Sequence, residues 1–285
     1  MEITQIIDYL IHHYKIGTIS NFQPLIGGTV SELYLLTTYH NDRYVVKMNH
    51  PEVIKTEDRF LTCYKDLSLL PSHFYTDSNY RYIVYSYIEG STNYPHRNKQ
   101  EMLKIVVEEL INQYEVVHDA KGWGFADEVS ESWQSFLMSR VQEASTLVNS
   151  YLEQNDYTLV QHLVQTSELN QETVPYLLHG DCGVHNFIFL DGKISGVIDP
   201  TAVYGHPLYD LVYAFFSSPD ELTKEAFDFA FGHFKFKDNA NSNNYGEVLI
   251  GLYLRLSTCI KHHPHDLENY LKAWNYWIEI FRNDK

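Results

Sequence analysis

The chain has 285 residues, of which 44% are hydrophobic and 20% are charged, a composition typical of a globular protein with a substantial core in one large domain or two lobes. Its formal net charge of −16 argues against nucleic acid and anionic membranes as partners, because both bind basic surfaces. The chain has no run of about 18 apolar residues, no secretory signal and no CxxC pair, so we expect a cytoplasmic protein.

Apolar residues alternate through the first part of the chain and predict three strands, at Phe22–Ile26, Glu32–Tyr39 and Arg43–Met48. The turn between the first two strands contains Gly27, Gly28 and Ser31. A glycine turn between antiparallel strands lets backbone N–H groups approach phosphate oxygens, and a serine hydroxyl can add to them. The spacing matches neither GxGxxG nor GxxxxGK[ST], so an ordinary hairpin remains the alternative.

Lys47 lies at the end of an otherwise apolar run in the third predicted strand. Such a lysine needs a partner if it faces inward, whereas on an edge strand it would be exposed. The next segment offers three acidic candidates, Glu52, Glu57 and Asp58. Helical phase favours Glu57, because it shares one helix face with Leu61 and Tyr64.

Helical patterns dominate the chain after an apolar strand that runs into a glycine-ended connector at Tyr82–Gly90. Apolar residues recur on one helix face from Leu103 to Val117, and further helices are predicted over Ser132–Gln154 and Asn155–Glu168. Asp210 begins another apolar helix, which we expect it to cap.

The most informative segment places Asp181, Asn186 and Asp199 close together in the sequence. Between the last two, Phe187–Leu190 and Ile194–Ile198 predict a hairpin that turns at Asp191-Gly192 and brings Asn186 and Asp199 side by side. Phosphoryl transfer needs such a set, in which one carboxylate orients and deprotonates a hydroxyl while an Asn oxygen and a second carboxylate hold magnesium. The alternative is that these residues are a turn residue, a cap and a strand end.

This segment resembles the aminoglycoside phosphotransferase family, the small-molecule relatives of protein kinases. The family's catalytic loop reads His-Gly-Asp with Asn five residues after the Asp, and its metal-binding Asp lies in an Ile-Asp pair near the end of the next hairpin, as here. The resemblance extends from Leu25 to about Ser218, and Gly122–Phe125 with Ser132–Phe136 is more loosely similar to the hygromycin-phosphotransferase branch. It implies a bilobal, protein-kinase-like α+β fold. Residues 1–88 would form a nucleotide-binding lobe that ends in a hinge, and residues 89–285 a mainly helical catalytic and substrate lobe.

The resemblance also implies a role for each matching residue. Asp181 would be the catalytic base, with Asn186 beside it, and Asn186 and Asp199 would bind Mg²⁺. Lys47 would contact the α- and β-phosphates and be held by Glu57.

The hinge and the support of the catalytic loop follow from the same resemblance. Adenine would be bound through the backbone of Ser86, Tyr87 and Ile88. His179 would pack and bond to backbone, and Asp210 would accept hydrogen bonds from the catalytic loop.

We therefore expect a Mg²⁺-dependent enzyme that transfers the γ-phosphate of ATP or GTP to a hydroxyl of a small molecule, either aminoglycoside-like or another amino or sugar metabolite. It would act as a monomer or homodimer without nucleic acid or membrane partners. The acidic net charge would suit a cationic acceptor, or it merely aids solubility.

Two alternatives are weaker. A protein kinase is opposed by Pro200, which follows Asp199 where protein kinases have Phe-Gly. A non-catalytic nucleotide-binding module is opposed by the presence of Lys47, Asp181, Asn186 and Asp199.

Overall fold

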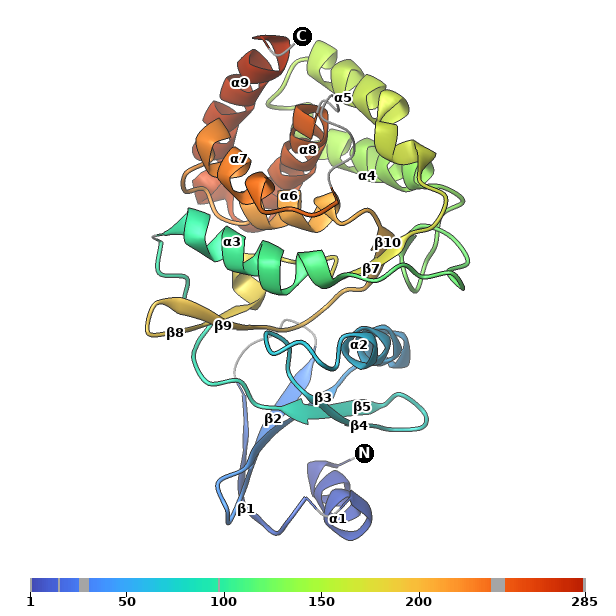
Figure 1. Cartoon of the computed structure of the whole chain (residues 1–285), viewed down its shortest axis with the longest axis vertical. Helices are drawn as coiled ribbons and strands as arrows, with labels where there is room; N and C mark the ends of the chain where they lie inside the picture. Colours follow the sequence, from blue (N-terminus) through green and yellow to red (C-terminus); the bar gives the residue numbers. More distant parts are fainter. Residues whose placement is uncertain (1, 15, 26–30, 97, 237–243, 284–285) are drawn as a thin grey trace. The chain divides into compact units, whose positions relative to one another are not determined.

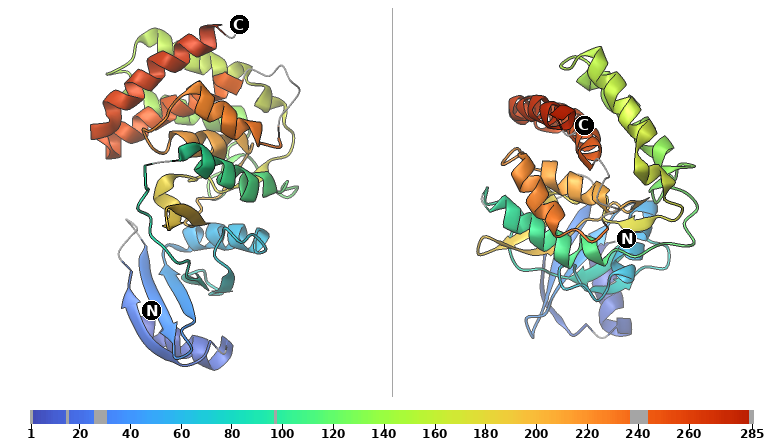
Figure 2. Two further views of the ribbon diagram at one scale, coloured as in Figure 1. Left: turned by 60° about the vertical axis from the view of Figure 1, so that its left-hand side comes forward. Right: turned by 45° about the horizontal axis from the view of Figure 1, so that its top comes forward.

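The computed structural model describes residues 2–14, 16–25, 31–96, 98–236 and 244–283. The chain divides into two compact units, Met1–Glu89 and Gly90–Lys285. The first unit is built around an antiparallel sheet and the second is mainly helical (Figures 1 and 2), which confirms the predicted α+β class. No helix within the described ranges is long and apolar enough to cross a membrane.

The sheet of the N-terminal unit has five antiparallel strands in the order β1-β2-β3-β5-β4 (Figure 1). The strands are β1 (Ile19–Pro24), β2 (Glu32–Thr38), β3 (Arg43–Met48), β4 (His73–Thr76) and β5 (Tyr82–Ser86). The three predicted strands are confirmed in their described parts: β1 begins earlier, at Ile19, because its pairing with β2 extends back to that residue, it ends at Pro24, and Ile26 lies outside the described residues. Because β3 lies between β2 and β5, Lys47 is on a central strand and not on an edge.

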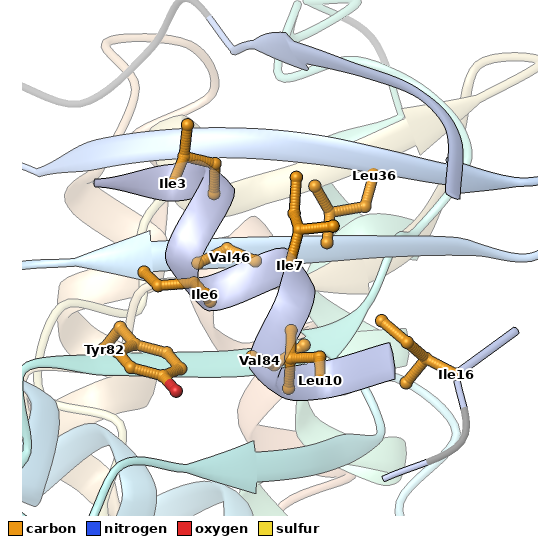
Figure 3. Close-up of a cluster of buried hydrophobic side chains, with 9 residues drawn as sticks. All are labelled: Ile3, Ile6, Ile7, Leu10, Ile16, Leu36, Val46, Tyr82 and Val84. Carbon is orange, nitrogen blue, oxygen red and sulfur yellow. The ribbon is translucent and has the colours of Figure 1, made fainter. Parts of the chain in front are cut away.

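A helix that the sequence patterns did not predict, α1 (Ile3–Tyr14), covers one face of this sheet. Figure 3 shows its apolar stripe packed against strand residues, a cluster formed by Ile3, Ile6, Ile7, Leu10, Ile16, Leu36, Val46, Tyr82 and Val84. Successive side chains of a strand point to opposite faces, so Val46 faces α1 and its neighbour Lys47 faces away. The opposite face is the one that meets α2 (Pro51–Cys63), whose Glu57 contacts Lys47.

The helices of the C-terminal unit pack around α8, which contacts α4, α5, α6 and α9 (Figures 1 and 2). They are α3 (Lys99–Glu109), α4 (Trp133–Val148), α5 (Gln154–Thr166), α6 (Leu208–Phe216), α7 (Lys224–Gly232), α8 (Asn244–His262) and α9 (Leu267–Asn283). Short 3₁₀ turns lie at Ile111–Gln113, Glu168–Gln171, Val184–Asn186 and Pro264–Asp266. The helix predicted as far as Val117 is wrong in its second half: α3 ends at Glu109 and Tyr114 is extended.

Two small β elements carry the segments around the sequence motif. One is a three-stranded sheet in the order β6-β10-β7, formed by β6 (Gly124–Phe125), β10 (Val203–Gly205) and β7 (Tyr176–Leu178). The other is the predicted hairpin, which is confirmed as β8 (Phe187–Leu190) and β9 (Lys193–Val197). Its turn residues Asp191 and Gly192 have φ values of 50° and 77°, and positive φ at both positions is what a type I′ turn requires.

Candidate active site

The β8–β9 hairpin holds the two predicted metal ligands on neighbouring segments. Asn186 immediately precedes β8, and Asp199 lies two residues beyond β9. The Ile198 N–H donates to the Asn186 carbonyl oxygen at 2.9 Å, which continues the ladder up to these residues. Asp199 has a φ of 57°, a left-handed conformation that is unfavourable by about 1–2 kcal/mol for a residue with a side chain. Strain of this kind is concentrated at functional sites, where the surrounding structure maintains it.

Asp181 lies at the centre of a hydrogen-bond network. Asn186 Nδ2 donates to the Asp181 carboxylate and to its backbone carbonyl, each at 2.9 Å. The Tyr213 hydroxyl donates to the other carboxylate oxygen, and His185 Nε2 lies 3.1 Å from Oδ2. Burial by itself would raise the pKa of Asp181, but the hydrogen bonds from His185 and Tyr213 and the charge of His185 hold that pKa below its ordinary value. Asp181 is therefore ionised at neutral pH, the form that a general base requires.

The donor atoms at the hairpin end fit a magnesium ion. The Asn186 amide nitrogen is committed to Asp181, so its oxygen is the atom left for a metal, and Asp199 offers a carboxylate. Oxygen ligands of these types are the ones that Mg²⁺ prefers, in octahedral coordination. Within the described ranges, no three His, Cys, Asp or Glu side chains gather into a metal site.

His179 is fully buried, and its ring makes hydrogen bonds to two backbone groups. Its Nε2–H donates to the Ile198 carbonyl oxygen at 2.9 Å, and its Nδ1 accepts from the Asp181 N–H at 3.3 Å. Burial lowers the pKa of His179 to about 4, although Asp181 and Asp199 are nearby. The neutral ring satisfies both bonds, which connect the segments that carry Asp181 and Asp199.

Asp210, the third residue of α6, is also fully buried and faces the catalytic loop. Its carboxylate accepts hydrogen bonds from the His179 N–H at 2.8 Å, the Gly180 N–H at 3.0 Å and the Tyr114 hydroxyl at 2.7 Å. The prediction that Asp210 caps its helix is wrong, because α6 begins at Leu208 and the carboxylate is occupied by the loop. Burial raises the pKa of Asp210 to about 7, and these hydrogen bonds lower it in part.

We expect acidification to destabilise the protein through His179. An unfolded histidine binds its proton near pH 6.5, whereas His179 in the folded state binds it only near pH 4, so stability falls as the pH drops through this window. The difference between the two pKa values corresponds to about 3 kcal/mol.

Urea unfolding at pH 7 and pH 5 measures the part of this loss that falls above pH 5, about 2 kcal/mol, and His179→Gln is the matched variant. Asp210 has a raised pKa, so its protonation stabilises the folded state as the pH falls, which is opposite to the effect of His179. Asp210 is present in both the wild type and the variant, so its contribution is the same in the two proteins. The variant should therefore lose less stability on acidification than the wild type. Identical losses would contradict the assignment to His179.

In the N-terminal unit, Lys47 and Glu57 form a buried ion pair. Lys47 Nζ lies 2.6 Å from Glu57 Oε2, and the side chains are only 5% and 1% exposed. The other two acidic candidates pair elsewhere: Glu52 with the exposed Lys55, and Asp58 with residues of β4. A buried lysine whose charge is held in place is suited to bind phosphate.

The structure describes only part of the glycine turn that was predicted to contact the nucleotide phosphates. Ser31 accepts a hydrogen bond from Asn49 through its hydroxyl, and Gly27 and Gly28 lie outside the described residues.

Where β5 runs into its connector, two of the three backbone N–H groups predicted to bind adenine already donate hydrogen bonds within the protein. The Ser86 N–H donates to the Ser72 carbonyl oxygen at 2.9 Å, and the Tyr87 N–H donates to the Arg43 carbonyl oxygen at 3.1 Å. In the part of the chain that the structure describes, the Ile88 N–H makes no hydrogen bond. Of the three predicted adenine-binding residues, Ile88 is thus the one whose N–H is open to a ligand.

Two residues beside the catalytic loop were not predicted. Tyr213, which donates to Asp181, follows Asp210 by three positions and so lies on the same face of α6. The three-residue spacing from Asp210 is the sequence feature from which Tyr213 could have been predicted. Ser217 accepts a hydrogen bond from the Val184 N–H at 3.1 Å and so also holds the loop.

Comparison with known proteins gives one family match. A sequence model described as the phosphotransferase enzyme family matches residues 21–237. No protein of curated function matches the sequence of this chain.

Solved structures resemble the chain over nearly its whole length. Aminoglycoside phosphotransferase APH(4)-Ia has a TM-score of 0.61 and 16% identity, and the match covers 99% of each chain. A thermostable mutant of APH(4)-Ia in ternary complex with ADP and hygromycin B has a TM-score of 0.57 and 15% identity, over 98% of each chain. Macrolide 2'-phosphotransferase MphH from Brachybacterium faecium has a TM-score of 0.59 and 15% identity, over 95% of this chain and 97% of that one. At these identities the likeness shows a shared fold.

Proposed function

We propose that this chain, which belongs to the phosphotransferase enzyme family, transfers the γ-phosphate of ATP to a hydroxyl group of a small molecule. The observation that carries the proposal is the ionised Asp181, held by Asn186 and Tyr213 beside the hairpin that bears Asp199. In the reaction, the bond between the γ-phosphorus and the bridging oxygen breaks and a new bond to the acceptor oxygen forms. The hydroxyl proton passes to Asp181, and ADP leaves.

Phosphoryl transfer depends mainly on the positioning of the reactants and on charge balance, and the residues of the site contribute to one or the other. Asp181 orients the acceptor hydroxyl and takes its proton, a contribution of about 10²–10⁴ in rate. Asn186 fixes the Asp181 carboxylate and, with Asp199, offers oxygens to magnesium. The metal, when bound with the nucleotide, neutralises phosphate charge. Lys47, oriented by Glu57, would contact the α- and β-phosphates.

The donor is assigned as ATP, with GTP as the alternative. In other kinase-like proteins the hinge binds the base through its backbone, and Ile88 has the open N–H in this segment. Among the similar structures, the APH(4)-Ia mutant was solved with ADP, which is the basis for naming an adenine nucleotide first.

We expect magnesium and nucleotide to stabilise the protein together more than either does alone, because Asn186 and Asp199 offer too few ligands to hold the ion without phosphate oxygens. Thermal unfolding with MgATP, ATP plus chelator, and Mg²⁺ alone measures this. Nucleotide at about 100 times its Kd adds about 2.7 kcal/mol. Equal stabilisation by ATP with and without metal would contradict the metal assignment. The same series with GTP identifies the donor, and ADP release with an acceptor shows whether transfer occurs.

A further inference from the structure

The C-terminal unit contains a pocket that opens to solvent and is lined mainly by residues of α4, α6 and α8. Tyr213 lines this pocket, and its hydroxyl donates to the Asp181 carboxylate. A molecule in the pocket would therefore contact Tyr213, which is hydrogen-bonded to the group that is proposed to accept the hydroxyl proton.

Most of the pocket wall is apolar, formed by side chains that include Trp133, Leu137, Tyr209, Val212, Ile250 and Leu254. The aromatic side chains are packed together: the ring centroids of Trp133 and Tyr209 are 5.5 Å apart at an edge-to-face angle of 81°. Such a wall favours a ligand with an apolar body, because burial of apolar surface drives its transfer from water.

Two arginines interrupt this apolar wall. Arg140 of α4 has its guanidinium carbon 5.2 Å from the centroid of the Phe125 ring. Arg255 of α8 is held by the Tyr270 hydroxyl, which accepts from Nε at 3.1 Å, and by the Ser217 carbonyl oxygen at 3.4 Å from Nη2. Neither arginine forms an ion pair with an Asp or Glu among the described residues. Neither guanidinium is therefore paired directly with a carboxylate among the described residues.

One acidic residue, Glu247, also lines the described part of the pocket. Its carboxylate accepts a hydrogen bond from the Ser167 hydroxyl. Burial raises the pKa of Glu247 to about 7, and this hydrogen bond lowers it only in part, so near neutral pH the side chain is incompletely charged. The pocket consequently keeps a net positive charge, although the whole chain carries −16.

We propose that this pocket binds the phosphate acceptor, and that the acceptor combines an apolar body with an anionic group, a carboxylate or a phosphate, held by Arg140 and Arg255. The inference rests on the proposed phosphotransfer and names its substrate class. The planar guanidinium group binds two oxygens of a carboxylate or a phosphate through paired charge-assisted hydrogen bonds. A polycationic acceptor would instead meet two like charges in the pocket, which opposes its binding.

A binding experiment tests the charge preference without requiring turnover. The anionic dye anilinonaphthalene sulfonate and its uncharged parent phenylnaphthylamine are titrated by fluorescence into the folded protein. The anion should bind about tenfold more tightly than the neutral dye, and Arg140→Gln should remove about tenfold of its affinity, as loss of a charge-assisted hydrogen bond predicts. Arg255→Lys keeps the charge and should lose less affinity than Arg140→Gln.

The matched control is Arg282→Gln, which removes the same charge from an exposed position on α9 outside the pocket. It should leave the affinities for both dyes unchanged. Equal affinities for the two dyes in the wild type, or an anion preference that survives Arg140→Gln, would overturn the proposal.

Turnover assays identify the anion and separate this inference from the proposed function. ADP release is measured with MgATP and four acceptors that share one hydroxyl-bearing alkyl chain: ω-hydroxydodecanoate, ω-hydroxydodecyl phosphate, ω-hydroxydodecanamide and ω-aminododecanol. Faster turnover with either anion supports the proposal, and the faster of the two identifies the group. Turnover with the amine alone would contradict the proposed anionic acceptor but would still support phosphotransfer. Absence of turnover with all four, with the dye preference intact, would count against phosphotransfer and leave the charge of the pocket established.

Discussion

Replacement of Asp181 by Asn is expected to reduce turnover by a factor of about 10²–10⁴ and to leave nucleotide binding intact. The substitution keeps the size of the side chain and one acceptor oxygen, so the hydrogen bond from Tyr213 can persist. It removes the charge that makes Asp181 a base, and its low pKa shows that this charge is present throughout the neutral range. ADP release under saturating acceptor and MgATP measures the loss of turnover, and isothermal calorimetry with MgATP measures binding.

Asp199→Asn is the matched control for this prediction. Asn adopts the left-handed conformation of Asp199 more readily than most residues, so the substitution removes a metal-binding carboxylate without new backbone strain. We expect it to weaken MgATP binding as well as turnover. The decisive comparison is that of MgATP binding, which Asp181→Asn should retain and Asp199→Asn should weaken. An Asp181 variant that turns over a confirmed acceptor at the wild-type rate would disprove the assignment of this loop.

Replacement of Lys47 by Met is expected to weaken both folding and nucleotide binding. The substitution leaves Glu57, which is 1% exposed, without its cation, and loss of one member of a buried pair is destabilising by about 3–5 kcal/mol. Urea unfolding measures the stability. Lys55→Met is the control, because its pair with Glu52 is more than half exposed on both sides and should contribute less than about 1 kcal/mol.

A double variant separates the two effects of Lys47. In Lys47→Met with Glu57→Leu, both charges are replaced by apolar side chains, and such replacements of a buried pair are often neutral or stabilising. Stability should therefore return towards that of the wild type, while the affinity for MgATP stays low. Recovery of nucleotide affinity together with stability would show that Lys47 serves folding alone.

The hairpin that carries Asn186 and Asp199 could be predicted because its determinants are local. Two short apolar runs and the Asp191-Gly192 turn specify it, and a hairpin fixes which residues meet at its open end. The choice of Glu57 over its neighbours was also local, since helical phase alone selected the residue that contacts Lys47.

The features that local sequence patterns did not predict depend on contacts between distant segments. The pattern at Asp210 is that of a helix cap, whereas its carboxylate accepts hydrogen bonds from backbone N–H groups about thirty residues earlier in the chain, as only the family resemblance implied. The apolar run that ends at Val117 continues the helical spacing of α3, yet the backbone leaves the helix and Tyr114 brings its hydroxyl to Asp210. The arginines of the pocket come from α4 and α8, and no spacing in the sequence links them.

Of the helices that line the pocket, α6 bonds to the catalytic loop and α4 does not within the described residues, and this difference affects how acceptor preference can evolve. Helix α6 is bonded to the loop that carries Asp181 through Asp210 and Tyr213, so under the proposed function substitutions there would damage catalysis whatever the substrate. Helix α4 supplies Trp133, Leu137 and Arg140 to the same pocket, and none of these side chains bonds to the catalytic loop within the described residues. Selection can therefore act on α4 almost independently, and a lineage could exchange one acceptor for another by substitutions on this single helix while its catalytic apparatus stays unaltered.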